Sequence, residues 1–422
     1  MIDIYYNFNF NHPDGITGSP SSYSAYNNNG LYNFDSKANQ FDLNFAKLTL
    51  SHSPDPVGFD IDFGFGRTAE TINTAFPEDT NGFQYVEQAF IELKPAKAKG
   101  FEIDFGKFVT SAGAEVIESY NNWNYSRSLL FTWAIPYYHM GVRTSWPMGK
   151  KWTGGFQLVN GWNDVSQTLN SGKTIGAVAA LTTTKASWFI NYYTGPSNVG
   201  TNTGWLNLID TTLLLTPTGK WSKLNMYLNY DYDHKGNAVA KGPASSWYGI
   251  AGDLHEQLNA KWAMAQRFEW FDDPNGADLS LALPPAVAGD MVPQQVKEFT
   301  LTFEYKMLEG MLWRLEYRRD WSTYPMFLRG TYPDQTDYCN YNGQDDSGFF
   351  CANQEDEDTL VKAPDTGSGL VNRTPLPFPT PSSPGGEFPE ILNPRSGQGL
   401  YGFSKSQNTL TLAFMAFFGP KR

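Results

Sequence analysis

Residues 57–67 read VGFDIDFGFGR, and large apolar residues alternate with polar or small ones along the whole stretch. Phe59 and Ile61 occupy one set of positions, while Asp60 and Asp62 occupy the other. Successive side chains of a β-strand point to opposite faces of the sheet. The pattern therefore predicts a strand with one face against an apolar medium and the other against a polar one.

The same alternation recurs along the chain, for example in FEIDFGK (101–107) and MLWRLEYRRDW (311–321). Such segments number about sixteen, each of about 8–13 residues, which suits tilted strands that cross a bilayer. We expect one all-β domain over residues 1–422, a transmembrane antiparallel β-barrel. The predicted strands are 2–10, 40–50, 57–67, 84–94, 101–108, 136–146, 151–160, 174–183, 185–194, 205–216, 221–232, 246–255, 258–271, 295–307, 311–321 and 406–418.

The connections between these strands alternate between short turns, such as PTGK (217–220), and long segments. Outer-membrane barrels have short periplasmic turns and long extracellular loops. The alternation thus predicts an outer-membrane protein of bacteria with both chain termini in the periplasm. The predicted extracellular loops are 11–39, 68–83, 109–135, 161–173, 195–204, 233–245, 272–294 and 322–405.

Composition narrows the class of protein. The net charge of −12 argues against a nucleic-acid partner. No apolar run reaches the length of about 18 residues that would indicate a transmembrane helix. Aromatic residues gather near predicted strand ends, as Trp146, Trp152, Trp221 and Trp321 do. Such rings favour lipid–water boundaries, although aromatic residues also prefer strands in general.

The face opposite the apolar one is polar on most predicted strands, with residues such as Asp60, Glu102, Asn229 and Glu298. We expect this face to line a wet lumen rather than a packed core. A barrel of about sixteen strands is wide enough for an aqueous channel.

Several stretches resemble one family in particular. They are YYNFNFNHP (5–13), GKFVTSAGAEVIESYNNWNYSRSLLF (106–131) with its continuation to residue 147, VNGWNDVSQTLNSGKTIGA (159–177), NYYTGP (191–196) and RFEWFDDPNG (267–276). In these stretches the chain resembles the OmpL-like β-barrel porins of Gram-negative-type bacteria. The resemblance covers roughly residues 1–320 and the last strand. It implies an outer-membrane channel and does not imply a substrate.

The connection 109–135 is rich in Asn, Tyr and Ser and carries the apolar run Leu129–Phe131. We expect this segment to fold into the barrel as a constriction loop. Acidic and basic side chains facing each other across a narrow pore would set its charge preference. The alternative is that these charges pair only to hold the loop in place. The predicted constriction residues are Glu115, Glu118, Tyr120, Arg127, Arg143, Arg267, Arg314 and Arg318.

The two cysteines, Cys339 and Cys351, lie close together in the predicted loop 322–405. An oxidising compartment favours a local disulfide between them, and free thiols are the alternative. No metal site is expected from Cys and His spacing. The acidic run Glu355, Asp356, Glu357 and Asp358 is a weak Ca²⁺ candidate without EF-hand spacing, and a solvated charge run is the simpler interpretation.

No catalytic set or nucleophile elbow is present, so an enzyme is not expected and no cofactor is implied. The leading hypothesis is a porin for passive diffusion of small polar solutes or ions. The alternatives are a plugged, surface-displayed barrel with a binding or structural role, and a substrate-specific sugar channel. Expected partners are outer-membrane lipid and lipopolysaccharide, and a homo-trimer follows only by analogy with porins.

Overall fold

The structure is a computed structural model, and it describes most of the chain. The described residues are 1–13, 29–73, 82–166, 170–236, 244–279, 293–324, 326–329 and 402–418. Cys339, Cys351 and the acidic run 355–358 lie outside them, as does most of the segment 322–405.

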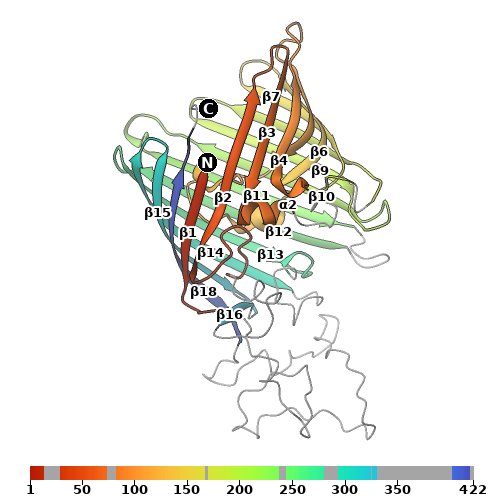
Figure 1. Cartoon of the computed structure of the whole chain (residues 1–422). Helices are drawn as coiled ribbons and strands as arrows, with labels where there is room; N and C mark the ends of the chain where they lie inside the picture. Colours follow the sequence, from red (N-terminus) through yellow and green to blue (C-terminus); the bar gives the residue numbers. More distant parts are fainter. Residues whose placement is uncertain are drawn as a thin grey trace, which may run out of the picture.

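Sixteen antiparallel strands form one closed barrel, in which each strand pairs with its neighbour in sequence and β1 closes the ring on β18 (Figure 1). The predicted strand count and fold class are thereby confirmed. The first eight strands are β1 (Ile2–Asn9), β2 (Gln40–His52), β3 (Val57–Phe65), β4 (Val86–Leu93), β5 (Glu102–Val109), β6 (Tyr138–Pro147), β7 (Trp152–Val159) and β8 (Thr174–Thr182). The others are β9 (Ala186–Pro196), β10 (Trp205–Leu215), β11 (Leu224–Lys235), β12 (Ser245–Gln257), β13 (Trp262–Asp273), β14 (Gln294–Leu308), β15 (Met311–Ser322) and β18 (Ser406–Ala416).

The register places both ends of the barrel sequence at one rim. Ala416 pairs with Ile2 on β1 and with Met311 on β15. Met311 follows the short turn after β14, so β1 begins and β18 ends on the side of the short turns. We call this rim the short-turn end and the opposite rim the long-loop end.

The outer face of the barrel is apolar, as the alternation predicted. On β3, Phe59 is 40% exposed while its neighbour Gly58 is buried, because the two positions face opposite sides of the sheet. An apolar surface of this kind suits lipid contact. Exposed apolar side chains on this face include Leu50, Ile91, Phe105, Phe156, Ile209, Leu228, Ile250, Phe303, Leu315 and Leu412.

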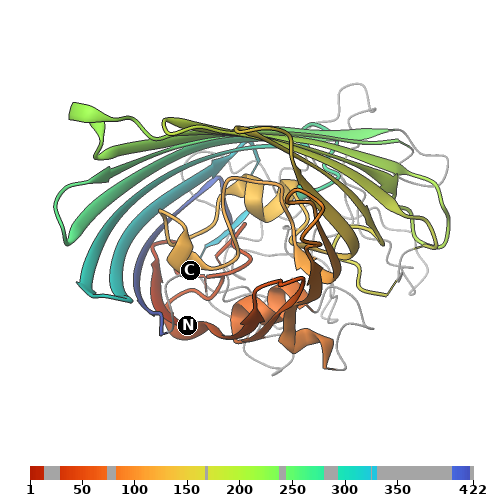
Figure 2. The ribbon, with the colours of Figure 1, turned by 90° about the horizontal axis from the view of Figure 1, so that it is seen from above.

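The lumen differs from the wet interior expected from the strands alone. Three segments that follow or precede strands fold inward, namely 29–38, helix α2 (Arg67–Asn73) and 109–135 (Figure 2). Their apolar side chains form one buried cluster with wall residues, which includes Phe34, Ile72 and Phe131. The strand pattern could not reveal this cluster, because its members come from the connections.

The segment 322–405 contains a small two-stranded sheet of β16 (Phe327–Arg329) and β17 (Gly402–Ser404). Phe327 is buried and its ring lies against Gly30 of the first inward segment. Within the residues that are described, every helix is too short or too polar to span a membrane.

Candidate functional site

The segment 109–135 has a defined local structure of its own. It contains a 3₁₀ turn, η3 (Ser119–Asn121), and a single π-helical turn, η4 (Leu130–Ala134). The Ser128 hydroxyl accepts a hydrogen bond from the Phe131 N–H at 2.9 Å, which satisfies a free donor at the start of η4. The Asn122 side chain bridges both backbone groups of Val116. Ser, Asn and Tyr are therefore frequent here because they replace strand hydrogen bonds.

Arg267 on β13 is the main anchor of this segment. Its guanidinium is fully buried and donates to Glu115 at 2.7 Å, to Glu298 at 2.9 Å and to the Ser126 carbonyl at 2.8 Å. Glu269 lies 2.9 Å from the same group. Three carboxylates around one buried guanidinium form a network that joins the loop to two neighbouring strands.

Arg314 and Arg318 on β15 are also buried and donate to carbonyl oxygens of the loop. Arg314 donates to Ser119 at 2.6 Å and to Asn124 at 3.0 Å. Arg318 donates to the Arg127 carbonyl at 2.7 Å. Both guanidinium groups thus donate to loop carbonyls and nearby carboxylates, and neither group is exposed to solvent.

Other loop residues contact the part of the barrel where β1 and β18 close the ring beside β15. Glu118 forms a salt bridge with Lys47 on β2. The Tyr125 hydroxyl donates to Asp3 on β1 at 2.8 Å, and burial raises the pKa of this phenol well above its ordinary value. Tyr120, only partly buried, lies against Phe417 with ring centroids 5.8 Å apart.

We call strands β9–β15 the tied wall, because each of them hydrogen-bonds the loop. Gly113 N–H donates to Asp210 on β10 at 3.0 Å, and Ala114 N–H donates to Asn229 on β11 at 3.0 Å. Further contacts come from Asn191, Asp253, Arg267, Thr302, Arg314, Glu316 and Arg318.

Apolar contact adds to these hydrogen bonds where η4 meets β12. A Cβ atom built on Gly249 would lie 2.6 Å from the Leu130 side chain. Only glycine therefore lets Leu130 approach the wall this closely. Leu129, Leu130 and Phe131 are all buried, so the apolar run noted in the sequence is what packs the loop into the barrel.

The inward segment 29–38 was not anticipated and packs directly on the loop. The Phe34 ring lies 5.7 Å from Phe131, and the Arg127 guanidinium lies 4.6 Å above Phe34. Trp133 donates its indole N–H to the Leu31 carbonyl at 3.1 Å. Leu31 and Phe34 in a polar connection were the available sequence signal, but their partners could not be read from it.

Asp35 in the same segment is a buried carboxylate near Arg127 and Arg318. Burial, together with the nearby negative Glu316, raises its pKa to about 7 even though the two arginines oppose the shift. One of its oxygens, Oδ2, has no hydrogen-bond partner.

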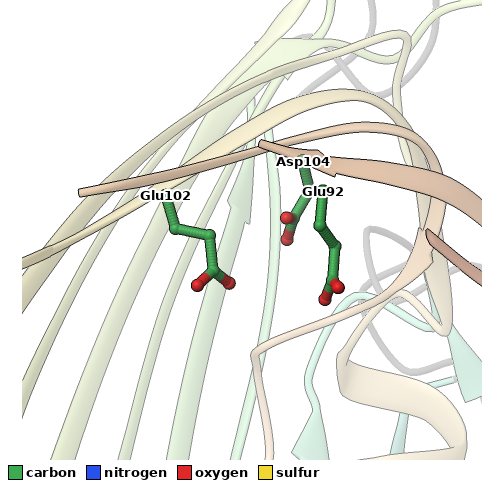
Figure 3. A group of neighbouring side chains, drawn as sticks. All are labelled: Glu92, Glu102 and Asp104. Carbon is green, nitrogen blue, oxygen red and sulfur yellow. The ribbon is translucent and has the colours of Figure 1, made fainter. Parts of the chain in front are cut away.

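A second group of charges faces the lumen from β4 and β5. Carboxylate oxygens of Glu92, Glu102 and Asp104 lie within 4.8 Å of one another (Figure 3). Lys94 pairs with Glu102 at 2.6 Å, and Arg143 pairs with Asp104 at 2.6 Å. This group was not among the predicted site residues apart from Arg143.

We call β3–β5 the open wall, because the inward side chains Asp60, Glu92 and Glu102 stay partly exposed, although Asp62, Glu87 and Asp104 of the same strands are buried. The Glu102 side chain is 24% exposed and the Arg143 side chain on the adjoining strand is 26% exposed. Asp60 and Glu92 are also only partly buried. The open wall therefore presents carboxylates to water, whereas the inward arginine side chains of the tied wall are buried.

The predicted constriction residues separate into two sets. Glu115, Arg127, Arg267, Arg314 and Arg318 are buried together beneath or within the loop, which matches the alternative that charges hold the loop in place. Glu118, Tyr120 and Arg143 keep some exposure. His139 is buried and stacks on Tyr193 at 5.0 Å.

Comparison with known proteins gives one family. The family model described as "Putative beta-barrel porin-2, OmpL-like" matches residues 1–342, well over half of the chain. No curated protein matches the chain significantly.

Solved structures that are similar to the chain share about a tenth of its sequence. A loop L8 deletion mutant of OmpT, an outer membrane protein of Vibrio cholerae, has 10% identity and a TM-score of 0.49, with 99% of this chain and 97% of that chain covered. An anion-selective porin from Comamonas acidovorans has 10% identity and a TM-score of 0.48, covering 99% and 98%. The outer membrane channel DcaP of Acinetobacter baumannii has 10% identity and a TM-score of 0.49, covering 99% and 95%.

Proposed function

Because the chain belongs to the OmpL-like family of β-barrel porins, we propose that it forms an outer-membrane channel for passive diffusion of small polar solutes and ions. Segment 109–135 narrows the lumen, and the long-loop end faces the outside with both termini in the periplasm. The short turns lie at one rim and the long loops at the other, which supports this orientation.

The observation that carries the proposal is the unequal exposure of the two walls. The loop is fixed to the tied wall by buried arginines, whereas Asp60, Glu92 and Glu102 on β3–β5 stay partly exposed. A solute path along the open wall would pass three partly exposed carboxylates, Asp60, Glu92 and Glu102, and two cations, Lys94 and Arg143, of which Arg143 is paired with the buried Asp104. Side chains that line a pore set its charge preference, so the channel prefers cations.

Single-channel recording in planar bilayers tests the proposal. The purified chain should give open steps, and replacing residues 112–134 by a short Gly/Ser linker should raise the conductance several-fold. A reversal potential in a KCl gradient should show cation preference. A folded barrel that gives no steps, with or without the loop, would contradict a channel function.

The second candidate is a barrel that is closed and serves a binding or structural role. The apolar cluster inside the lumen favours it, because Phe34, Ile72 and Phe131 fill space that a wide diffusion pore leaves to water. The two candidates separate in the same recordings. The closed-barrel candidate would be supported if the wild-type barrel gave no conductance steps and the barrel without residues 112–134 gave them.

A further inference from the structure

A groove on the outer face of the barrel lies at the long-loop end of β13, β14, β15 and β18. Its volume is about 650 Å³, and it opens toward the surroundings of the protein. The groove is lined by Phe268, Phe299, Arg319, Trp321, Lys405 and Ser406. None of these side chains belongs to the lumenal site.

The floor of the groove is aromatic and continues the apolar outer face. Phe268 and Phe299 are cross-strand partners with ring centroids 4.7 Å apart, and Phe268 is 58% exposed. Farther toward the short-turn end the same face carries the exposed side chains Phe303 and Leu315. The groove therefore begins where the lipid-facing band ends.

Cations surround this floor on the side of the long-loop end. Arg319 pairs across the strands with Phe299 and lies 5.9 Å from the Trp321 ring. Lys405 lines the groove, and Lys297 is the cross-strand partner of Trp321. All three cations are exposed, and among the described residues none of them forms a salt bridge.

These cations contrast with the lumenal side chains of Arg143, Arg267, Arg314 and Arg318, each of which is paired with a carboxylate. The acidic residue on the outer face of β13 at this level is Asp272. Its carboxylate already accepts hydrogen bonds from Tyr248 at 3.2 Å and Gln295 at 3.4 Å. The groove thus combines an apolar floor with cations that form no salt bridge within the part of the chain that the structure describes.

We infer that this groove binds a phosphorylated glycolipid of the outer leaflet, with an acyl chain on the aromatic floor and a headgroup phosphate between Arg319 and Lys405. Guanidinium and ammonium groups form strong charge-assisted hydrogen bonds with phosphate. Aromatic rings at a lipid–water boundary suit the junction between chain and headgroup. Lys297 adds a further positive charge for a second phosphate.

The inference rests on the proposed orientation, because only the outer leaflet carries such a glycolipid. It is independent of whether the lumen conducts. Binding and conductance are therefore measured on the same preparations, so that the failure of one is separated from the failure of the other.

The test is native mass spectrometry of the full chain in detergent with diphosphorylated lipid A and with the same lipid after phosphatase treatment. The double variant Arg319→Gln, Lys405→Gln should bind the diphosphorylated lipid about thirtyfold more weakly, since each interfacial cation contributes about one kcal/mol and each 1.4 kcal/mol is a factor of ten. The affinity of the wild-type protein should fall by a similar factor when the phosphates are removed from the lipid.

The matched control is the double variant Lys220→Gln, Lys261→Gln. Lys220 lies 5.3 Å from the Trp221 ring and Lys261 lies 6.0 Å from the Tyr305 ring, so both cations have aromatic neighbours but lie at the short-turn end. This control should bind lipid A like wild type. A shift of apparent mass on unheated gels verifies that all variants are folded barrels.

Three outcomes would overturn the inference. They are equal affinity for the two lipids, an equal loss in the control variant, or a changed oligomeric state of Arg319→Gln, Lys405→Gln with unchanged lipid affinity. The last result would make this face a contact between copies of the chain. Lost conductance with retained lipid binding would contradict the channel proposal instead.

Discussion

The tied wall and the open wall are parts of one sheet, yet the inward arginine side chains are buried on the first and several inward carboxylates stay partly exposed on the second. On the tied wall, Arg267 is enclosed by carboxylates and loop carbonyls and has no contact with water. On the open wall, Glu92 and Glu102 remain partly exposed beside two cations. A charge on the inner face of a barrel is thus not necessarily a pore-lining charge, because an inward segment can bury it.

The largest effect is expected from Arg267→Ala on the tied wall. Removing this guanidinium leaves Glu115, Glu269 and Glu298 buried without their shared cation. Breaking a buried ion pair from one side costs about 3–5 kcal/mol. We expect a lower free energy of unfolding in urea and large, noisy conductance steps as the loop comes free.

Arg143→Ala on the strand beside the open wall is the matched comparison. Its side chain is 26% exposed and pairs with one carboxylate, the buried Asp104. We expect a smaller loss of stability than for Arg267→Ala, because one carboxylate rather than three loses its cation. If the two variants were equally destabilised, the distinction between the walls would fail.

A smaller effect, on selectivity rather than stability, is expected from Glu92→Gln with Glu102→Gln. The double change removes two of the carboxylates that face water on the open wall. The reversal potential in a KCl gradient should move toward that of a non-selective pore. Glu115→Gln, at a buried position within the loop, serves as the control and should leave ion preference unaltered. A larger change of ion preference in Glu115→Gln than in the double variant would place the solute path along the tied wall.

A different effect, on the pH dependence of stability, is expected at Asp35. Its pKa of about 7 in the folded protein exceeds the ordinary value of 3.8, so the folded state binds the proton more tightly than the unfolded state. Stability should therefore fall as pH rises from about 4 to 7 and then level off. Asp35→Asn should flatten this decline and be more stable than wild type at pH 8.

Urea unfolding of both proteins at pH 4.5 and pH 8 checks this prediction. Asp278, whose pKa burial also raises, contributes its own slope to both curves and does not affect their difference. Identical pH profiles for wild type and Asp35→Asn would show that this carboxylate is not held protonated.

Much of the fold could be predicted because its signals are local. Alternation in 57–67 or 311–321 depends on neighbouring residues only, and every predicted strand corresponds to an observed one. The apolar run Leu129–Phe131 likewise indicated a segment that needs burial. Helix α2 and the segment 29–38 were missed, since their apolar residues, such as Ile72, Leu31 and Phe34, are scattered within polar connections and show no regular period.

The sequence by itself determined the number of strands, the face that each strand turns to lipid and the rim on which the long loops lie. These features depend on a two-residue period and on the spacing of turns, which are both local patterns of the sequence. Only the tertiary structure decided which charges remain exposed. Arg267 and Glu115 are 152 positions apart, and Arg318 and the carbonyl of Arg127 are 191 apart. Contacts across a lumen depend on how the inward segments pack, and no local pattern encodes that packing.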